Sequence, residues 1–326
     1  MSTPIKIVVA GPIPRDTIST YENQIITRYG CVTHPVVALA KLLETEGTVI
    51  PVSNVHDKDH PGILKEFEPW PNIATSSIDK AADRGTVIFL NFKDQNNREE
   101  RQLACMNPIV PDQIKDHLDA AAFVFVPITD FEISLRTLQY LKANSNGKII
   151  FDAHGATTAM DVYGKRHRKF WVDRDEWLPY IDVLKMNLEE SQCMWFANEY
   201  EGEIPSIYDE NKTDHLNDLA RHVLSMGVSY FYVTMDSRGC ILYHLVNGKI
   251  QKDWIASVKV GKVVDTTGCG DSFAGGLAYG FAKYDDPIKA GQFANILGAR
   301  RTQGKDWDVF KTAAETENIR LENYGL

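Results

Sequence analysis

The feature that most restricts the fold of this chain is a regular alternation of short apolar runs with longer helix-like stretches. Six runs of four to six residues read as buried strands: residues 5–10, 48–52, 122–126, 148–151, 183–186 and 230–235. Helix-like stretches lie between them at residues 34–43, 133–143 and 213–226. Strands that alternate with helices form a largely parallel sheet covered on both faces. The sequence therefore predicts a three-layer α/β fold, and its 326 residues suit one such domain with a small appendage.

Two segments, residues 15–28 and 86–106, depart from this rhythm because they alternate like exposed strands. The second contains a polar turn, Lys93-Asp-Gln-Asn-Asn-Arg98, between two strand-like halves. Together the segments predict a small sheet that stands off the main domain. The pattern alone leaves two interpretations open, namely ordinary surface hairpins or a lid that closes over a pocket. The small sheet has apolar residues that need cover: Ile18, Ile25, Val87, Phe89 and Leu103.

Charge and cysteine content argue against several classes of function. The net charge of −9 argues against nucleic-acid binding, because phosphate backbones need clustered Lys and Arg. A bound nucleotide is still compatible with this charge, since backbone amides can hold a phosphate. The five cysteines form no CxxC pair, which favours a reducing compartment without disulfides or a zinc site. The first apolar run is too short for a signal peptide and no stretch is long enough to span a membrane, so a cytoplasmic protein is expected.

The most informative segment is Val263-Val-Asp-Thr-Thr-Gly-Cys-Gly-Asp-Ser-Phe-Ala-Gly-Gly-Leu277. It predicts a strand, a tight turn and a helix that begins near Asp271. Gly268 and Gly270 permit backbone conformations that other residues avoid, and they let a ligand approach the main chain. The first amides of the helix have no partner within it, and the helix dipole favours an anion there. The turn therefore predicts a site that holds a phosphate during its transfer.

Asp271 admits two interpretations, because a carboxylate at the start of a helix is commonly only a cap. Asp265, however, is predicted at the carboxyl end of the preceding strand, where open α/β sheets bind their ligands. The two aspartates could act on one substrate, with Asp265 holding hydroxyl groups and Asp271 accepting a proton. Other phosphate sites are excluded, since the chain has no GxxxxGK[ST] sequence and this turn lacks the third glycine of GxGxxG.

The run from Asp265 to Gly276 resembles the C-terminal motif of the PfkB family of carbohydrate kinases, which have a ribokinase-like fold. Four further elements match that family in the same order along the chain: Gly11 to Asp16, Asn187-Leu-Glu-Glu190, Val233-Thr-Met-Asp-Ser-Arg-Gly239 and Phe293-Ala-Asn295. The resemblance covers nearly the whole chain. It implies a single kinase domain over residues 1–326 with a small β lid, which transfers a phosphoryl group from ATP to an alcohol of a sugar or sugar-like molecule.

The resemblance also implies roles for individual residues. Asp271 is the expected general base, and the transferring group is steadied by a turn of Gly268, Cys269 and Gly270. The residues expected at the acceptor are Asp16, Gly30 and Asp265. The residues expected along ATP are Asn187, Thr234, Asp236, Gly239 and Asn295.

Three further expectations concern ions and assembly. Mg²⁺ is expected on the ATP phosphates, with Glu190 and Asn187 acting on it through water. A monovalent cation such as K⁺ is expected near Asp265 and Thr267. A homodimer joined through the lids is expected, and the alternative is a monomer whose lid folds back on the large domain.

The departures from the family pattern gather at the acceptor end. The Gly-Gly element of the family appears here as Gly30-Cys31, and Pro14 and Pro35 stand where ribokinases commonly have Asn. Asp236 replaces a glycine of the nucleotide loop. The identity of the acceptor therefore stays open, and two alternatives to a sugar kinase remain: a nucleoside kinase, or a catalytically silent relative that binds a sugar or nucleotide. The basic run at residues 163–170 reads either as a solvated surface or as a phosphate-recognition segment.

Overall fold

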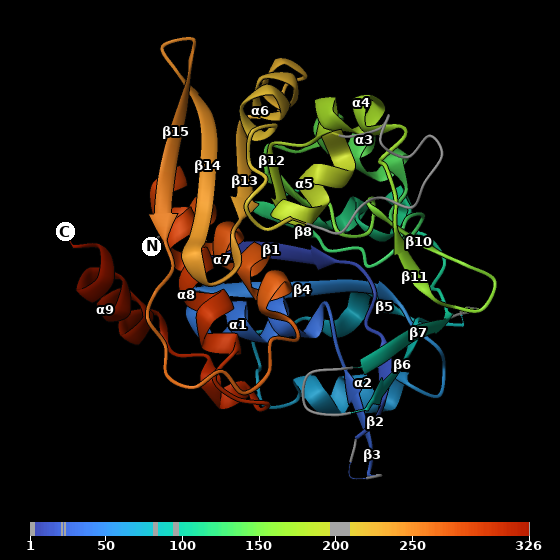
Figure 1. Ribbon diagram of the computed structural model, residues 1–326. Coiled ribbons are helices and arrows are strands. Elements are labelled where there is room, and N and C mark those ends of the chain that lie inside the picture. Colours follow the sequence, from blue (N-terminus) through green and yellow to red (C-terminus); the bar gives the residue numbers. More distant parts are fainter. Residues whose placement is uncertain are drawn as a thin grey trace.

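The computed structural model describes residues 4–20, 22, 24–80, 84–93, 98–195 and 209–325. Within these residues the centre is a nine-stranded sheet in the order β15-β14-β13-β12-β9-β8-β1-β4-β5 (Figure 1). Its strands are β1 (Ile5–Ala10), β4 (Gly47–Asn54), β5 (Ile78–Asp79), β8 (Ala122–Phe125), β9 (Lys148–Asp152), β12 (Val183–Asn187), β13 (Tyr230–Thr234), β14 (Gly239–Val246) and β15 (Lys249–Ala256). Neighbours from β13 to β5 run parallel, whereas β14 and β15 are antiparallel. The predicted α/β fold is confirmed.

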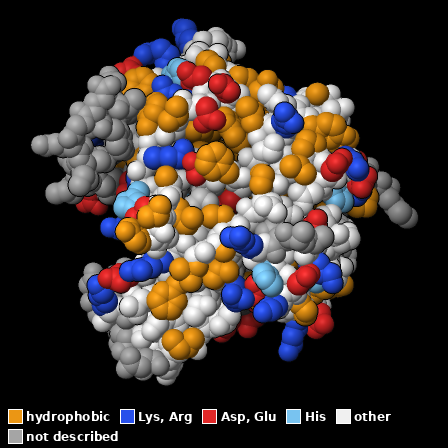
Figure 2. Space-filling model, turned by 90° about the vertical axis from the view of Figure 1, so that its right-hand side faces the viewer, with side chains coloured by type: hydrophobic (Ala, Val, Ile, Leu, Met, Phe, Trp, Pro, Cys, Tyr) orange, Lys and Arg blue, Asp and Glu red, His pale blue; other side chains and the backbone are white. Residues whose placement is uncertain are grey.

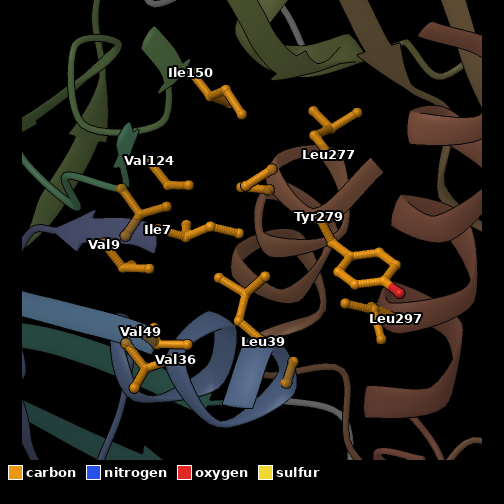
Figure 3. Packing of buried hydrophobic residues seen from close by; sticks show 14 of the residues in the cluster. Ile7, Val9, Val36, Leu39, Val49, Val124, Ile150, Leu277, Tyr279 and Leu297 are labelled. Atoms are coloured by element: carbon orange, nitrogen blue, oxygen red, sulfur yellow. The ribbon is translucent and has the colours of Figure 1, made fainter. Parts of the chain in front are cut away.

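Each central strand contributes to two hydrophobic cores, because successive residues of a strand point to opposite faces. In β1, Ile7 and Val9 pack into one core, and Val8 and Ala10 pack into the other. The first core is covered by α1 (Thr33–Leu43), α2 (His60–Phe67), α7 (Cys269–Tyr284), α8 (Pro287–Arg301) and α9 (Ala313–Tyr324), and Figure 3 shows part of it. The second core is covered by α3 (Leu135–Asn144), α4 (Arg174–Trp177), α5 (Leu188–Trp195) and α6 (Leu216–Ser225). Helices on both faces give the predicted three layers.

Close contact between α7 and α8 accounts for two glycines inside α7. A Cβ at Gly276 would lie 2.5 Å from the Cα of Ala294, and a Cβ at Gly280 would lie 2.3 Å from the Cα of Ala290. Carbon atoms do not approach so closely, so any larger residue would push the two helices apart. Glycine within a helix costs about 1 kcal/mol relative to alanine, and this packing offsets that cost.

A second sheet in the described residues, which we call the lid, has the order β3-β2-β6-β7 and stands off the large domain (Figure 1). Its strands are β2 (Arg15–Ser19), β3 (Ile25–Tyr29), β6 (Val87–Phe92) and β7 (Arg98–Ala104). They come from the two segments that the pattern singled out, and residues 94–97 of the predicted turn lie outside the described residues. The small predicted sheet is therefore present.

The two faces of the lid differ in burial. The inner face packs Ile18, Ile88 and Leu90 against Ile128 of the large domain. On the outer face, Ile25 is 66% exposed and Leu103 is 62% exposed. Ile25 pairs with Ser19 rather than with Ile18, and neighbouring residues point to opposite faces. Ile18 therefore needs no further cover, which corrects the expectation that it shares this need with Ile25.

One local expectation was wrong, and two hairpins were not predicted. The strand expected before the turn is absent: residues 263–266 form no strand, and the backbone amide of Val264 donates to the carbonyl of Thr302, directly after α8, at 2.8 Å. The β14–β15 hairpin was not predicted, since β15 is rich in polar residues and mostly exposed. A short hairpin of β10 (Thr158–Met160) and β11 (Arg166–Arg168) was also missed.

In the described ranges, no helix combines the length and apolarity that crossing a bilayer requires.

Candidate active site

The candidate site lies at the carboxyl edge of the central sheet, where parallel strands all end and open α/β sheets bind ligands. Asp152, Asn187 and Thr234 are the last residues of the neighbouring strands β9, β12 and β13. Polar side chains from three strands therefore meet at one edge. The N-terminus of α7 reaches the same place, because a Cβ on Gly270 would lie 3.2 Å from Nζ of Lys185 in β12.

The turn before α7 has the conformation that its glycines predict. Gly268 is the N-cap residue and has a φ of 80°, in the left-handed region that glycine adopts readily. A Cβ there would lie 2.3 Å from the ring of buried His34, so a larger residue would not fit. The amide of Cys269 donates to the carbonyl of Thr266 at 3.3 Å. The amides of Gly270 and Asp271, at the second and third helical positions, are thus the expected anion donors.

Asp271 is not the cap of its helix, because Gly268 occupies that position. Its Oδ1 lies 3.9 Å from the thiol sulfur of Cys31. Burial, reinforced by the carboxylate of Asp152, raises the pKa of Asp271 to about 6, against the opposing charge of Lys185. A carboxylate with a pKa near neutrality can hold a proton temporarily, as a general base must. The environment of Asp271 is therefore suited to proton transfer.

A buried ion pair next to Asp271 was missed by sequence reasoning. Nζ of Lys185 lies 2.7 Å from Oδ2 of Asp152, and the two side chains are 4% and 3% exposed. The carboxylates of Asp152 and Glu190 raise the pKa of Lys185 against the effect of burial, so it stays charged. One signal was available, since Lys185 interrupts the apolar run Val183–Leu184–Met186. The pair places a fixed positive charge beside the turn.

Asn187 and Glu190 form a reciprocal capping box at the start of α5. The backbone amide of Glu190 donates to Oδ1 of Asn187 at 2.7 Å, and the backbone amide of Asn187 donates to Oε2 of Glu190 at 2.8 Å. Oε1 of Glu190 also faces His154 at 2.9 Å and Arg168 at 3.4 Å. The Glu190 side chain is only 1% exposed. With its oxygens so occupied, Glu190 does not fit as a direct ligand of Mg²⁺, and the described residues contain no cluster of three or more His, Cys, Asp or Glu that could hold a metal.

The expected acceptor residues come together between the lid and the turn. Asp16 is buried on the inner face of the lid, and burial raises its pKa to about 7. A Cβ on Gly30 would lie 2.6 Å from Oδ2 of Asp16, so glycine is required beside this carboxylate. Arg28 donates to Oδ2 of Asp265 at 3.1 Å and lies 4.0 Å from Oδ2 of Asp16. Sequence reasoning missed Arg28, because no motif contains it.

Asp265 already has several partners. The amide of Thr267 donates to its Oδ1 at 2.9 Å, and Arg301 lies 4.0 Å from its Oδ2. Although burial opposes the charge, hydrogen bonds from Thr267 and the charge and hydrogen bond of Arg28 lower the pKa of Asp265 to about 2. Asp265 is therefore ionised at neutral pH, and its two neighbouring guanidinium groups disfavour a further cation there.

The expected nucleotide residues follow β13 and approach α8. Asp236 has a φ of 51° and Gly239 a φ of 110°, so Asp236 keeps the left-handed conformation of the glycine it replaces. Cys31, which stands at the second position of the family's Gly-Gly element, is also left-handed, with a φ of 46°. Asn295 is buried, and its side-chain amide donates to the carbonyls of Ile255 at 3.0 Å and Ala256 at 3.1 Å. This bond ties α8 to β15 and leaves a contact with adenine as an expectation.

The basic run at residues 163–170 borders a cavity of about 840 Å³ between the β10–β11 hairpin and β7. Arg166 pairs with Glu100, His167 with Asp161 at 3.0 Å, and Arg168 with Glu189 at 2.9 Å. Figure 2 shows the face that carries this region, where acidic and basic side chains are interspersed. Pairing of this kind favours the interpretation as a solvated surface over a phosphate-recognition segment.

Comparison with known proteins agrees with this geometry. The model of the pfkB family of carbohydrate kinases matches residues 72–306. The chain belongs to the PfkB family. A sugar kinase of Archaeoglobus fulgidus, described as uncharacterized, is 32% identical over 250 residues, which cover 75% of this chain and 86% of the relative. This PfkB chain is accordingly a phosphotransferase of the sugar kinase type.

Solved structures of low sequence identity share its fold. Ribokinase of Arabidopsis thaliana, solved with ribose and ATP, has a TM-score of 0.73 at 15% identity, and the match covers 98% of this chain and 99% of that chain. A nucleoside kinase of Burkholderia thailandensis, solved with inosine, has a TM-score of 0.70 at 17% identity and the same coverage. The PfkB chain therefore has the ribokinase-like fold that the motifs implied.

Proposed function

We propose that this protein transfers the terminal phosphoryl group of ATP to a hydroxyl group of a sugar or sugar-like molecule, with Asp271 as the general base. The observation that carries the proposal is the position of Asp271. Its carboxylate, with a pKa of about 6, stands on the first turn of α7 beside the anion-holding amides and the charged Lys185. Base and proposed anion site thus lie together at the start of α7.

In this reaction Asp271 takes the proton of the acceptor hydroxyl as its oxygen attacks phosphorus. Negative charge on the moving phosphoryl group is met by the amides of Gly270 and Asp271 and by the Lys185 ammonium group. Asp16 and Asp265 hold the acceptor, and Gly30 leaves room for it. ATP extends from the turn towards Asn187, Thr234, Asp236, Gly239 and Asn295.

Ions take a limited part in the proposal. Kinases of this class use Mg²⁺ to screen the charge of the phosphates, and we place it on the nucleotide because Glu190 is occupied by protein donors. Asn187 and Glu190 keep the start of α5 and His154 in position. The expected K⁺ site near Asp265 and Thr267 stays a prediction. The positive charges of Arg28 and Arg301 beside Asp265 argue against it.

The direct test is a panel of acceptors incubated with ATP and Mg²⁺, in which ADP and the phosphorylated product are both measured. Ribose, fructose, myo-inositol and inosine represent monosaccharides, cyclic polyols and nucleosides. Phosphorylation of a sugar or polyol supports the proposal, and exclusive phosphorylation of inosine would make the protein a nucleoside kinase. No phosphorylated product with any acceptor would favour a catalytically silent relative.

The pH dependence of turnover follows from the base. Asp271 accepts a proton only when ionised, and its pKa is about 6. We therefore expect kcat/KM for the acceptor to fall about tenfold per pH unit as the pH drops below that value. Initial rates between pH 5 and 8, with circular dichroism to confirm folding at each pH, provide the measurement. A rate that stays constant down to pH 5 would contradict the assignment.

We also propose that the single domain over residues 1–326 dimerises through the outer face of the lid. Ile25 and Leu103 are exposed there, and Val87 and Phe89 are half-buried on the adjacent strand. Apolar surface on a sheet is usually covered. Light scattering at micromolar concentration should give twice the mass of one chain. Leu103→Glu should reduce the measured mass to that of one chain. Val172→Glu, at a 79% exposed position on the large domain, is the control. An active wild-type monomer would reject the dimer.

A further inference from the structure

Arg28 is the side chain that joins both acceptor aspartates. It lies in β3 of the lid, directly opposite Asp16 of β2 in the antiparallel pair. Its Nη1 donates to Oδ2 of Asp265 at 3.1 Å, although the two residues are 237 positions apart in sequence. Its Nε lies 4.0 Å from Oδ2 of Asp16. An acceptor held by both aspartates must therefore contact this guanidinium group.

One donor atom of Arg28 lacks a hydrogen bond. Its Nε is buried and has no hydrogen-bond partner among the described residues. A buried donor without a partner is costly, which indicates that a ligand atom completes the arrangement. A separation of 4.0 Å to Asp16 is too long for a direct hydrogen bond. One oxygen atom, however, fits between them at about 2.8 Å from each.

We propose that Arg28 determines acceptor specificity by donating a hydrogen bond from Nε to a non-reacting hydroxyl group of the acceptor. This hydroxyl group in turn donates a hydrogen bond to Asp16. The inference rests on the proposed kinase function and deepens it. It requires an acceptor with at least two hydroxyl groups, one held between Arg28 and Asp16 and one delivered to Asp271. Among the groups of a sugar-like acceptor, a hydroxyl group suits both neighbours when Asp16 is ionised, because it accepts one hydrogen bond and donates another.

The surrounding charges favour a neutral acceptor. Carboxyl groups outnumber guanidinium groups around this point: Asp16, Glu100, Asp265 and Asp271 face Arg28, Arg166 and Arg301. Arg28 already has Asp265 as its counter-ion, so an anionic acceptor would have to break that pair. The structure therefore fits a neutral polyol or sugar rather than a sugar acid. Inner-face residues Asp16 and Arg28 close over it when the lid is in place.

A structural role for Arg28 makes a different prediction. If Arg28 only fastens the lid to the turn through Asp265, its loss would alter lid closure and would impair all acceptors equally. If Arg28 recognises a hydroxyl group, its loss would reduce the discrimination between the acceptor and one particular deoxy analogue. Discrimination between matched acceptors is therefore the deciding measurement, because general loosening of the lid leaves it unchanged.

The experiment uses the full chain, the best acceptor from the panel and its monodeoxy analogues. Arg28→Gln should raise the acceptor KM about 10–100-fold, leave the KM for ATP within about twofold and lower kcat by less than about threefold. The monodeoxy analogue that lacks this hydroxyl group should be a poor acceptor for the wild type. In Arg28→Gln the penalty for the missing hydroxyl should shrink at least about tenfold, and the remaining penalty reflects Asp16. Arg28→Lys keeps the charge near Asp265 but lacks Nε–H, so it should lose the same discrimination.

Arg15→Gln is the matched control, because Arg15 is also a lid arginine in an ion pair, with Asp59 at 3.0 Å. It should keep the acceptor KM and the discrimination of the wild type. Melting temperatures of all variants report folding. The inference is overturned if Arg28→Gln and Arg28→Lys both retain full discrimination, or if the KM for ATP rises instead. A wild type that phosphorylates no acceptor rejects the proposed function and this inference together, whereas active wild type with unchanged variants rejects this inference alone.

Discussion

Replacing Asp271 with Asn is expected to lower kcat by about 10²–10⁴-fold, the usual contribution of a positioned general base. Asparagine matches aspartate in shape but cannot accept a proton at neutral pH. The amides of Gly270 and Asn at the third helical position would still hold phosphate, so the affinity for ATP should change by less than about threefold. Steady-state kinetics with the best acceptor and calorimetric titration of ATP measure the two quantities separately.

Asp285→Asn provides the control for this substitution, because Asp285 lies beyond the opposite end of the same helix. It adopts a left-handed conformation with a φ of 47°, which asparagine also tolerates. Its kcat should equal that of the wild type. Turnover of Asp271→Asn within about threefold of wild type would refute the role of Asp271 as base, whereas joint loss of ATP affinity would indicate damage to the turn.

Replacing Lys185 with Met is expected to lower the free energy of unfolding by about 3–5 kcal/mol, because it leaves the buried Asp152 carboxylate without its counter-ion. Lys185 and Asp152 lie 2.7 Å apart and are almost fully buried. Lys185 also lowers the pKa of Asp271, so its loss should move the acidic limit of activity to higher pH. Urea denaturation followed by circular dichroism gives the stability, and a pH–rate profile gives the shift.

Two comparisons test this explanation of Lys185. Adding Asp152→Asn to Lys185→Met should recover at least half of the lost stability, because the uncompensated charge is removed while Oδ1 still accepts from the His154 amide. Lys142→Met breaks an exposed pair with Asp182 and should cost about 0–1 kcal/mol. If the single variant at Lys185 were as mild as the one at Lys142, or the double variant as unstable as the single, the buried pair would not have the importance we give it.

Much of the fold could be predicted because its signals are local. The first predicted strand coincides with β1 at Ile5–Ala10, and the helix expected at residues 34–43 is α1 at Thr33–Leu43. Alternation of apolar residues and the spacing of glycines are properties of neighbouring positions, so they can be read along the chain. The same holds for the turn at Gly268, whose positive φ follows from the steric freedom of glycine.

Prediction failed where the backbone hydrogen-bond partner of a segment lies outside the segment itself. Residues 263–266 begin with two valines and read as the end of a strand, but the amides of Val264 and Asp265 bond to Thr302 at the end of α8 rather than to a strand. β15 in turn has a polar sequence and pairs along its whole length with β14. Hydrogen bonds between strands depend on which edge is available, and this is decided by the complete sheet.

By itself, the sequence determined the α/β class, the strands of a small second sheet, the glycine turn before α7 and the family motifs, because each is a pattern of residues close together in the chain. Only the tertiary structure showed that Lys185 and Asp152 stand beside Asp271 and that Arg28 links Asp16 to Asp265. These contacts join residues on separate strands and helices, as far apart as positions 28 and 265. Their distances follow from how the sheet, the lid and α7 pack, and the strength of a charge interaction depends on that distance and on burial.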